Sequence, residues 1–85
     1  MYDLKDTIEL MTSDDYKERF VAEYWQTVIR YRKLYDLVQT WDSLEFTPDC
    51  PIEMFELQLQ AMENYLKILR ARAQIEGVSL DGTNN

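Results

Sequence analysis

The scarcity of helix-breaking residues is the feature that most constrains this chain. Its 85 residues include two glycines and two prolines. None of them falls within residues 15–41 or within residues 52–76. Apolar side chains recur at helical spacing through both stretches, which favours α-helices rather than strands. The sequence therefore predicts an all-α fold, with two long helices of about 39 Å each, paired as an antiparallel hairpin.

The residues around the first long helix suggest where it begins. Residues 12–15, Thr-Ser-Asp-Asp, form a predicted turn, and a short helix is expected over residues 3–11. Ser13 or Asp14 is expected to cap the long helix that follows, because its side-chain oxygen can accept from free backbone N–H groups. The acidic residues there also suit the positive end of the helix dipole. The first long helix is accordingly expected over residues 15–41.

Proline and glycine mark the ends of the second long helix. Pro51 suits the first helical position, where its missing N–H group is not needed. Gly77 suits the residue after the last turn, where a left-handed backbone conformation is common. The second long helix is therefore expected over residues 51–76, and the tail, residues 78–85, is expected to fray. Together these elements predict one helical domain spanning residues 1–85.

Two apolar stripes run along the second long helix. The first has a heptad spacing that suits packing against the other long helix. It consists of Ile52, Phe55, Leu59, Met62, Leu66, Leu69 and Ala73. The second stripe is offset by two residues and lies about 200° away. It consists of Met54, Leu57, Ala61, Ile68, Ala71 and Ile75. A helix with two apolar faces needs two partners. Another protomer is the expected second partner, and the alternative is that the short first helix folds back over the second stripe.

Composition excludes most catalytic chemistry. The chain has no histidine and a single cysteine, Cys50, which is expected to be a half-buried loop residue. His-based acid–base catalysis, Ser/His or Cys/His nucleophiles and Cys/His zinc sites are therefore excluded. Acidic residues near the first long helix are expected there as helix-start residues, so no metal site is predicted. We expect no enzyme activity, no catalytic residue and no cofactor.

Charge and hydropathy indicate the environment. No apolar run approaches the roughly twenty residues that span a bilayer, and the start of the chain does not resemble a signal peptide. The expected location is the cytoplasm, without membrane association. The net charge is −7, which disfavours binding to duplex nucleic acid.

Basic residues nevertheless gather on the first long helix. Arg19, Gln26, Arg30 and Lys33 fall within about 60° of one another on the helical wheel, with Tyr16 at the edge. Arginine and lysine donate charge-assisted hydrogen bonds to phosphate, and aromatic rings stack on bases. This strip would suit a nucleotide-like anion, and the alternative interpretation is a solvated polar face.

Arg72 is unusual because it interrupts the second apolar stripe. It lies one turn after Ile68 and two turns after Tyr65, which is a further candidate ligand contact. A charge on an apolar interface is unfavourable unless it is paired or reaches water. Arg72 is therefore expected to pair either with a carboxylate of a neighbouring protomer or with an anionic ligand between protomers.

The arrangement of these residues resembles a known family, the phage anti-CBASS cyclic-oligonucleotide sponges, also described as crAss-phage related small helical proteins. The resemblance covers about residues 16–76. It rests on Arg19-x3-Glu23, Arg30-Tyr31-Arg32-Lys33-Leu34 and Leu57-x-Leu59-Gln60-x-Met62-x2-Tyr65-x3-Leu69-x2-Arg72.

The resemblance implies a short helix before an antiparallel helix pair, assembled as a homo-oligomer that is typically a hexamer. It implies a phage immune-evasion protein that sequesters cyclic di- or trinucleotide signals at protomer interfaces without catalysis. By position, it assigns ligand contacts to Arg30, Lys33 and Arg72, and it makes Tyr16 the candidate base-stacking ring.

Two other functions fit the composition. An acidic, anti-CRISPR-like inhibitor could mimic nucleic-acid charge and bind a basic protein surface, provided that the acids face outward. They are Asp14, Asp15, Glu18, Glu53, Glu56 and Glu63. The third possibility is a structural helical module of a larger assembly.

Overall fold

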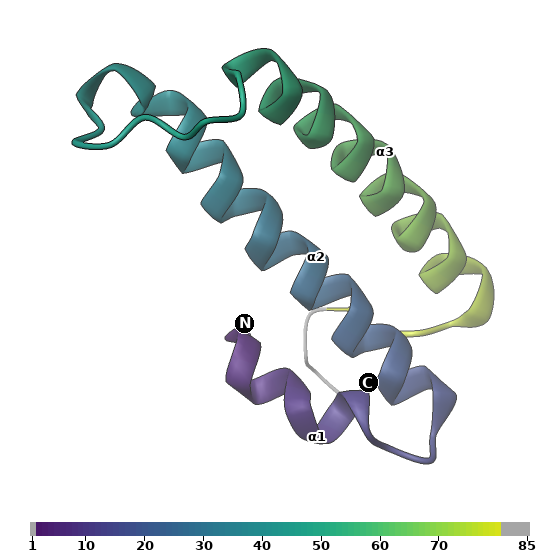
Figure 1. Cartoon of the computed structure of the whole chain (residues 1–85). Helices are drawn as coiled ribbons and strands as arrows, with labels where there is room; N and C mark the ends of the chain where they lie inside the picture. The colour runs from purple at the N-terminus through teal and green to yellow at the C-terminus, as the bar shows by residue number, and fades with distance from the viewer. Residues whose placement is uncertain (1, 81–85) are drawn as a thin grey trace.

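The computed structural model describes residues 2–80, and every regular element in that part of the chain is helical. A 3₁₀ turn at Leu4–Asp6 leads into α1, Thr7–Met11, and then α2 spans Tyr16–Gln39. A second 3₁₀ turn, Trp41–Ser43, and a loop precede α3, Ile52–Glu76. Figure 1 shows α2 and α3 as an antiparallel pair, with α1 on the side of α2 away from α3. The all-α prediction is confirmed.

The N-terminus of α2 is capped one residue later than expected. The backbone N–H of Lys17 donates to the Asp15 carboxylate at 2.9 Å, so the expected cap at Ser13 or Asp14 is wrong. The Ser13 hydroxyl is used elsewhere. It accepts from the Asp15 backbone N–H at 3.0 Å and donates to Glu18 at 2.5 Å. These bonds tie the turn to the first turn of α2.

The end of α2 and the start of α3 differ from the expected positions by one or two residues, which is within the usual uncertainty of helix boundaries. The α-helical part of α2 stops at Gln39, and the expected residue 41 lies in the 3₁₀ turn Trp41–Ser43. Pro51 immediately precedes α3, and its carbonyl accepts from the Met54 N–H at 3.0 Å. Cys50, expected to be half-buried, is exposed in the preceding loop.

Gly77 ends α3 as predicted, with a left-handed backbone at φ 68°. The Val78 N–H donates to the Ala73 carbonyl at 2.9 Å, which reverses the chain. Val78 and Leu80 consequently pack against the core, and the Leu80 carbonyl accepts from the Trp25 indole N–H. The expectation that the tail frays is therefore wrong for these two residues. Residues 81–85 lie outside the described residues.

The core lies at the crossing of α2 and α3. Its buried side chains come from both helices, and the rings of Tyr24, Trp25 and Tyr31 pack around them. They are Phe20, Val28, Leu66, Leu69 and Ala73. The α3 members belong to the heptad stripe predicted to face the other long helix. Burial of that stripe confirms which side of α3 meets α2.

The short helix α1 is held against α2 by polar bonds. The Thr7 side chain is completely buried; its hydroxyl donates to the Leu4 carbonyl at 2.6 Å and accepts from the Gln26 amide at 3.0 Å. The amide of Gln26 also contacts the Met11 sulfur at 3.3 Å. Because α1 packs on α2, the alternative that it covers the second stripe of α3 is wrong.

The second stripe of α3 is left uncovered by the described residues. Leu57 is 64% exposed, Ile68 56% and Ile75 83%. Burying such side chains fully would contribute roughly 1.5–3 kcal/mol each. We call the exposed residues Met54, Leu57, Ala61, Ile68, Ala71 and Ile75 the open stripe.

Replacing Gly77 with alanine is expected to lower the free energy of unfolding by about 1–2 kcal/mol, because an L side chain is strained in the left-handed region. Gly77→Asn should lose less, since asparagine tolerates that region better. Urea denaturation followed by circular dichroism measures both variants. Equal stability of the alanine variant and the parent chain would contradict the role given to this cap.

Candidate ligand-binding face

The α2–α3 pair has two sides, distinguished by two arginines of α3. Arg70 Nε donates to the Tyr24 hydroxyl at 3.3 Å. The Arg72 guanidinium lies over the Phe20 ring, 4.7 Å from its centre. Side chains two positions apart on a helix point in directions that differ by about 200°. The two arginines therefore flank the α2–α3 contact from opposite sides. We call these sides the Arg70 face and the Arg72 face.

The Phe20 ring explains how Arg72 is tolerated on an apolar helix surface. The cation–π attraction compensates part of the unfavourable position of this charge. The guanidinium carries five N–H donors and no acceptor. Among the described residues no hydrogen-bond or ion-pair partner of Arg72 is found. Arg72 is thus held over Phe20 while its donors remain available to an anion.

Tyr65 extends this site along α3. It lies two helical turns before Arg72, on nearly the same line of the helix, and its side chain is 38% exposed. The open-stripe residue Ile68 lies one turn from each of these side chains, and Ala61 lies one turn before Tyr65. The Arg72 face therefore combines an aromatic ring, a stacked guanidinium and uncovered apolar surface.

Tyr16 and Arg19 lie at the first turns of α2. Arg19 Nη1 donates to the Ser13 carbonyl at 2.6 Å, so this side chain already stabilises the turn before the helix. The Tyr16 ring is 43% exposed. A ligand would find the ring of Tyr16 more accessible than the occupied donor of Arg19.

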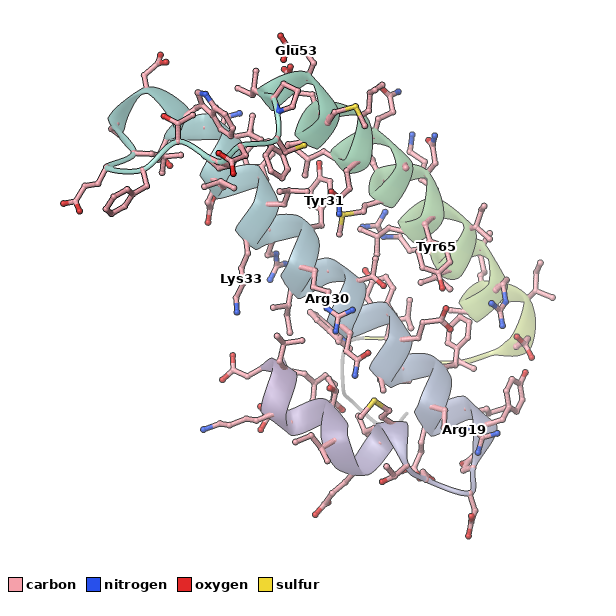
Figure 2. All side chains as sticks on the ribbon, viewed as in Figure 1. Arg19, Arg30, Tyr31, Lys33, Glu53 and Tyr65 are labelled. Atoms are coloured by element: carbon pink, nitrogen blue, oxygen red, sulfur yellow. The ribbon has the colours of Figure 1, made fainter. Side chains whose placement is uncertain are left out.

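The basic strip predicted on α2 is divided by α1, because Gln26 is half-buried by its bonds to that helix. Arg30 and Lys33 are exposed beyond this point and have no polar partner among the described residues. Figure 2 shows Lys33 pointing to the side of α2 away from α3. The single chain therefore does not bring Lys33 together with Tyr65 and Arg72.

Sequence reasoning missed the Arg70 face. The predicted ligand contacts did not include Tyr24, Tyr31 or Lys67. In the structure these residues and Arg70 line a shallow groove between α2 and α3. The available signal was the Lys67–Arg70 spacing on α3 and the Tyr24–Tyr31 spacing on α2, which places each pair on one side of its helix.

The described residues lack the features of two other classes of site. No group of three or more Cys, Asp or Glu side chains there is arranged to hold a metal ion. Between residues 2 and 80, no helix is long and apolar enough to cross a bilayer.

One comparison with known proteins gives a match. The family model described as Sequestin matches residues 14–75, which is more than half of the chain and includes all of α2 and nearly all of α3. No curated protein and no solved structure matches this chain.

Proposed function

This chain belongs to the Sequestin family, and we propose that it sequesters cyclic di- or trinucleotide second messengers at interfaces between its protomers. The family match agrees with the sponge resemblance in the sequence, and the family name denotes sequestration. Function would then depend on affinity and on the number of protein copies. No bond of the ligand would need to be broken, so the absence of histidine is no obstacle.

The observation that carries this proposal is the position of Arg72, over the Phe20 ring and among the residues of the open stripe. The phosphates of a cyclic oligonucleotide carry negative charge, and an oriented guanidinium can bind a phosphate with two parallel hydrogen bonds. Its bases can stack on exposed tyrosine rings such as Tyr16 and Tyr65. Arg30 supplies a further cation on α2.

A homo-oligomer, expected to be a hexamer, would complete such a site. The open stripe supplies apolar surface for contact with a second protomer, and Arg72 lies within that stripe. Because Lys33 points away from α3, it would contribute to a site with Arg72 only if the two came from different protomers. An interface site therefore accounts for the separation of these candidates within one chain.

Replacing Arg72 with glutamine is expected to weaken cyclic-oligonucleotide binding by about ten- to a hundred-fold, since a hydrogen bond to a charged group contributes roughly 1.5–3 kcal/mol. Calorimetry against cyclic di-, tri- and tetranucleotides measures this, with light-scattering mass on the same samples. Lys17→Gln is the matched control, because it removes a cation at the exposed start of α2. Unchanged affinity in Arg72→Gln would contradict the site, and no binding across the panel would contradict the function.

Charge mimicry remains the second candidate. All six acids that it requires are exposed, namely Asp14, Asp15, Glu18, Glu53, Glu56 and Glu63. This function predicts salt-sensitive binding to a basic protein surface and no affinity for cyclic nucleotides. The same calorimetric panel therefore separates the two candidates.

A further inference from the structure

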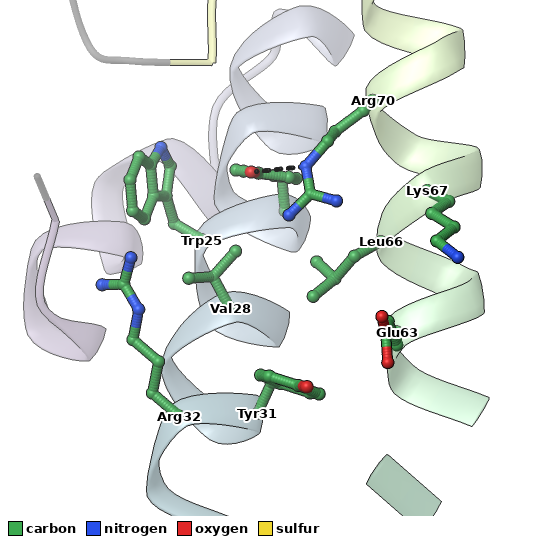
Figure 3. Close-up of a pocket in the computed structure, with 9 residues that line it drawn as sticks. Trp25, Val28, Tyr31, Arg32, Glu63, Leu66, Lys67 and Arg70 are labelled. Carbon is green, nitrogen blue, oxygen red and sulfur yellow. Dashed lines mark hydrogen bonds between the residues drawn. The ribbon is translucent and has the colours of Figure 1, made fainter. Parts of the chain in front are cut away.

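The groove on the Arg70 face has the composition of a binding site for an aromatic anion. Figure 3 shows it between α2 and α3, with Val28 and Leu66 between the two helices. Tyr24 and Tyr31 of α2 line it with aromatic surface, beside Trp25. Apolar and aromatic walls with a few polar groups are typical of small-molecule sites.

Charge in this groove opposes that of the whole protein. Lys67 and Arg70 of α3 and Arg32 of α2 line it, against the single carboxylate of Glu63. The lining is therefore net positive in a chain whose net charge is −7. A local positive potential of this kind selects small anions, because a large anionic surface would also meet the surrounding acids.

Arg70 is held in position by Tyr24. Its Nε donates to the tyrosine hydroxyl at 3.3 Å, and its guanidinium lies 5.8 Å from the centre of the same ring. One donor is thereby occupied, and the terminal N–H groups remain for a further acceptor. Lys67 lies on the same side of α3, one turn earlier, where a phosphate bound by Arg70 would be within reach of its ammonium group.

The size of the groove limits its occupant. Its volume is about 270 Å³, just below the range of roughly 300–1,000 Å³ typical of drug-sized ligands. A cyclic dinucleotide or trinucleotide has two or three bases and phosphates and would not fit inside. We propose that the groove binds a nucleoside monophosphate, with its base against Tyr24 and Tyr31 and its phosphate on Lys67 and Arg70. This site is separate from the Arg72 face and does not depend on the proposed function.

Trp25 lies at the groove and provides a local probe. In ¹⁵N-labelled protein the two indole N–H signals can be assigned with Trp41→Phe, because Trp41 packs on Phe55 away from the groove. Titration with adenosine 5′-monophosphate is expected to shift the Trp25 signal to saturation. Adenosine and inorganic phosphate, added separately, should each bind at least about ten-fold more weakly. Adenosine lacks the phosphate group, and inorganic phosphate lacks the base.

Lys67→Gln is expected to weaken monophosphate binding by about ten-fold, whereas Lys17→Gln should leave it unchanged. Arg72→Gln should also leave it unchanged, which separates this site from the cyclic-oligonucleotide site. The proposal is overturned if the monophosphate does not shift Trp25, if inorganic phosphate binds as tightly, or if Lys67→Gln binds normally. Loss of monophosphate binding in Arg72→Gln would overturn the separation of the two faces.

Discussion

Replacing Leu69 with alanine is expected to lower the free energy of unfolding by about 3–5 kcal/mol. Leu69 is completely buried at the crossing of α2 and α3, beside Phe20 and Ala73. Alanine would leave a cavity that two rigid helices cannot close, so both transfer energy and packing contacts are lost. A loss of this size is a large fraction of the roughly 5–15 kcal/mol that stabilises a typical domain.

Thermal and urea unfolding followed by circular dichroism measure this effect. Phe46→Ala is the matched control, because it truncates a large apolar side chain that is 86% exposed in the loop before α3. The control should change the stability by less than about 0.5 kcal/mol. Similar losses in the two variants would mean that the α2–α3 crossing is not the principal core.

Replacing Ile68 with lysine is expected to dissociate the protein into single chains of 10.2 kDa. Ile68 lies in the middle of the open stripe, and lysine would place a charge in the proposed contact between protomers. Because Ile68 is 56% exposed in the single chain, the helical content should be retained. Burying an unpaired charge costs several kcal/mol at each interface, which is enough to disrupt a contact of ordinary size.

Light-scattering mass and far-ultraviolet circular dichroism test this variant together. Gln60→Lys is the matched control, since it makes the same change in charge on the solvated side of α3 and should keep the parent mass. If Ile68→Lys also keeps the parent mass, the open stripe is not the contact between protomers. If the proposed function holds, dissociation should also abolish cyclic-oligonucleotide binding, while the groove of the Arg70 face should still bind a monophosphate.

The site was only partly accessible to sequence reasoning. The position of Arg72 on an apolar stripe follows from helical spacing, and so does its need for a partner. Its stacking on Phe20 does not, because Phe20 lies 52 positions earlier in the chain and meets Arg72 only when α2 and α3 cross. The separation of Lys33 from Arg72 likewise depends on how α2 and α3 are oriented relative to each other, because Lys33 lies on the side of α2 that points away from α3.

The sequence by itself determined the helices and the side of α3 that is buried. Absence of glycine and proline allowed two long helices, Gly77 ended the second, and the heptad stripe containing Leu66 and Leu69 required α2 as its partner. These features are local, because backbone hydrogen bonds and side-chain periodicity depend on residues within a few positions of one another.

Only the tertiary structure decided how the remaining surfaces are used. The Thr7–Gln26 bond directs α1 onto α2, and the Trp25–Leu80 bond brings the tail back to the core. The Arg70–Tyr24 bond joins α2 and α3 in the groove of the Arg70 face. Each bond joins residues at least 19 positions apart. From the sequence alone, each donor could bond any of several similar acceptors. Only the packing of the helices selects one of them.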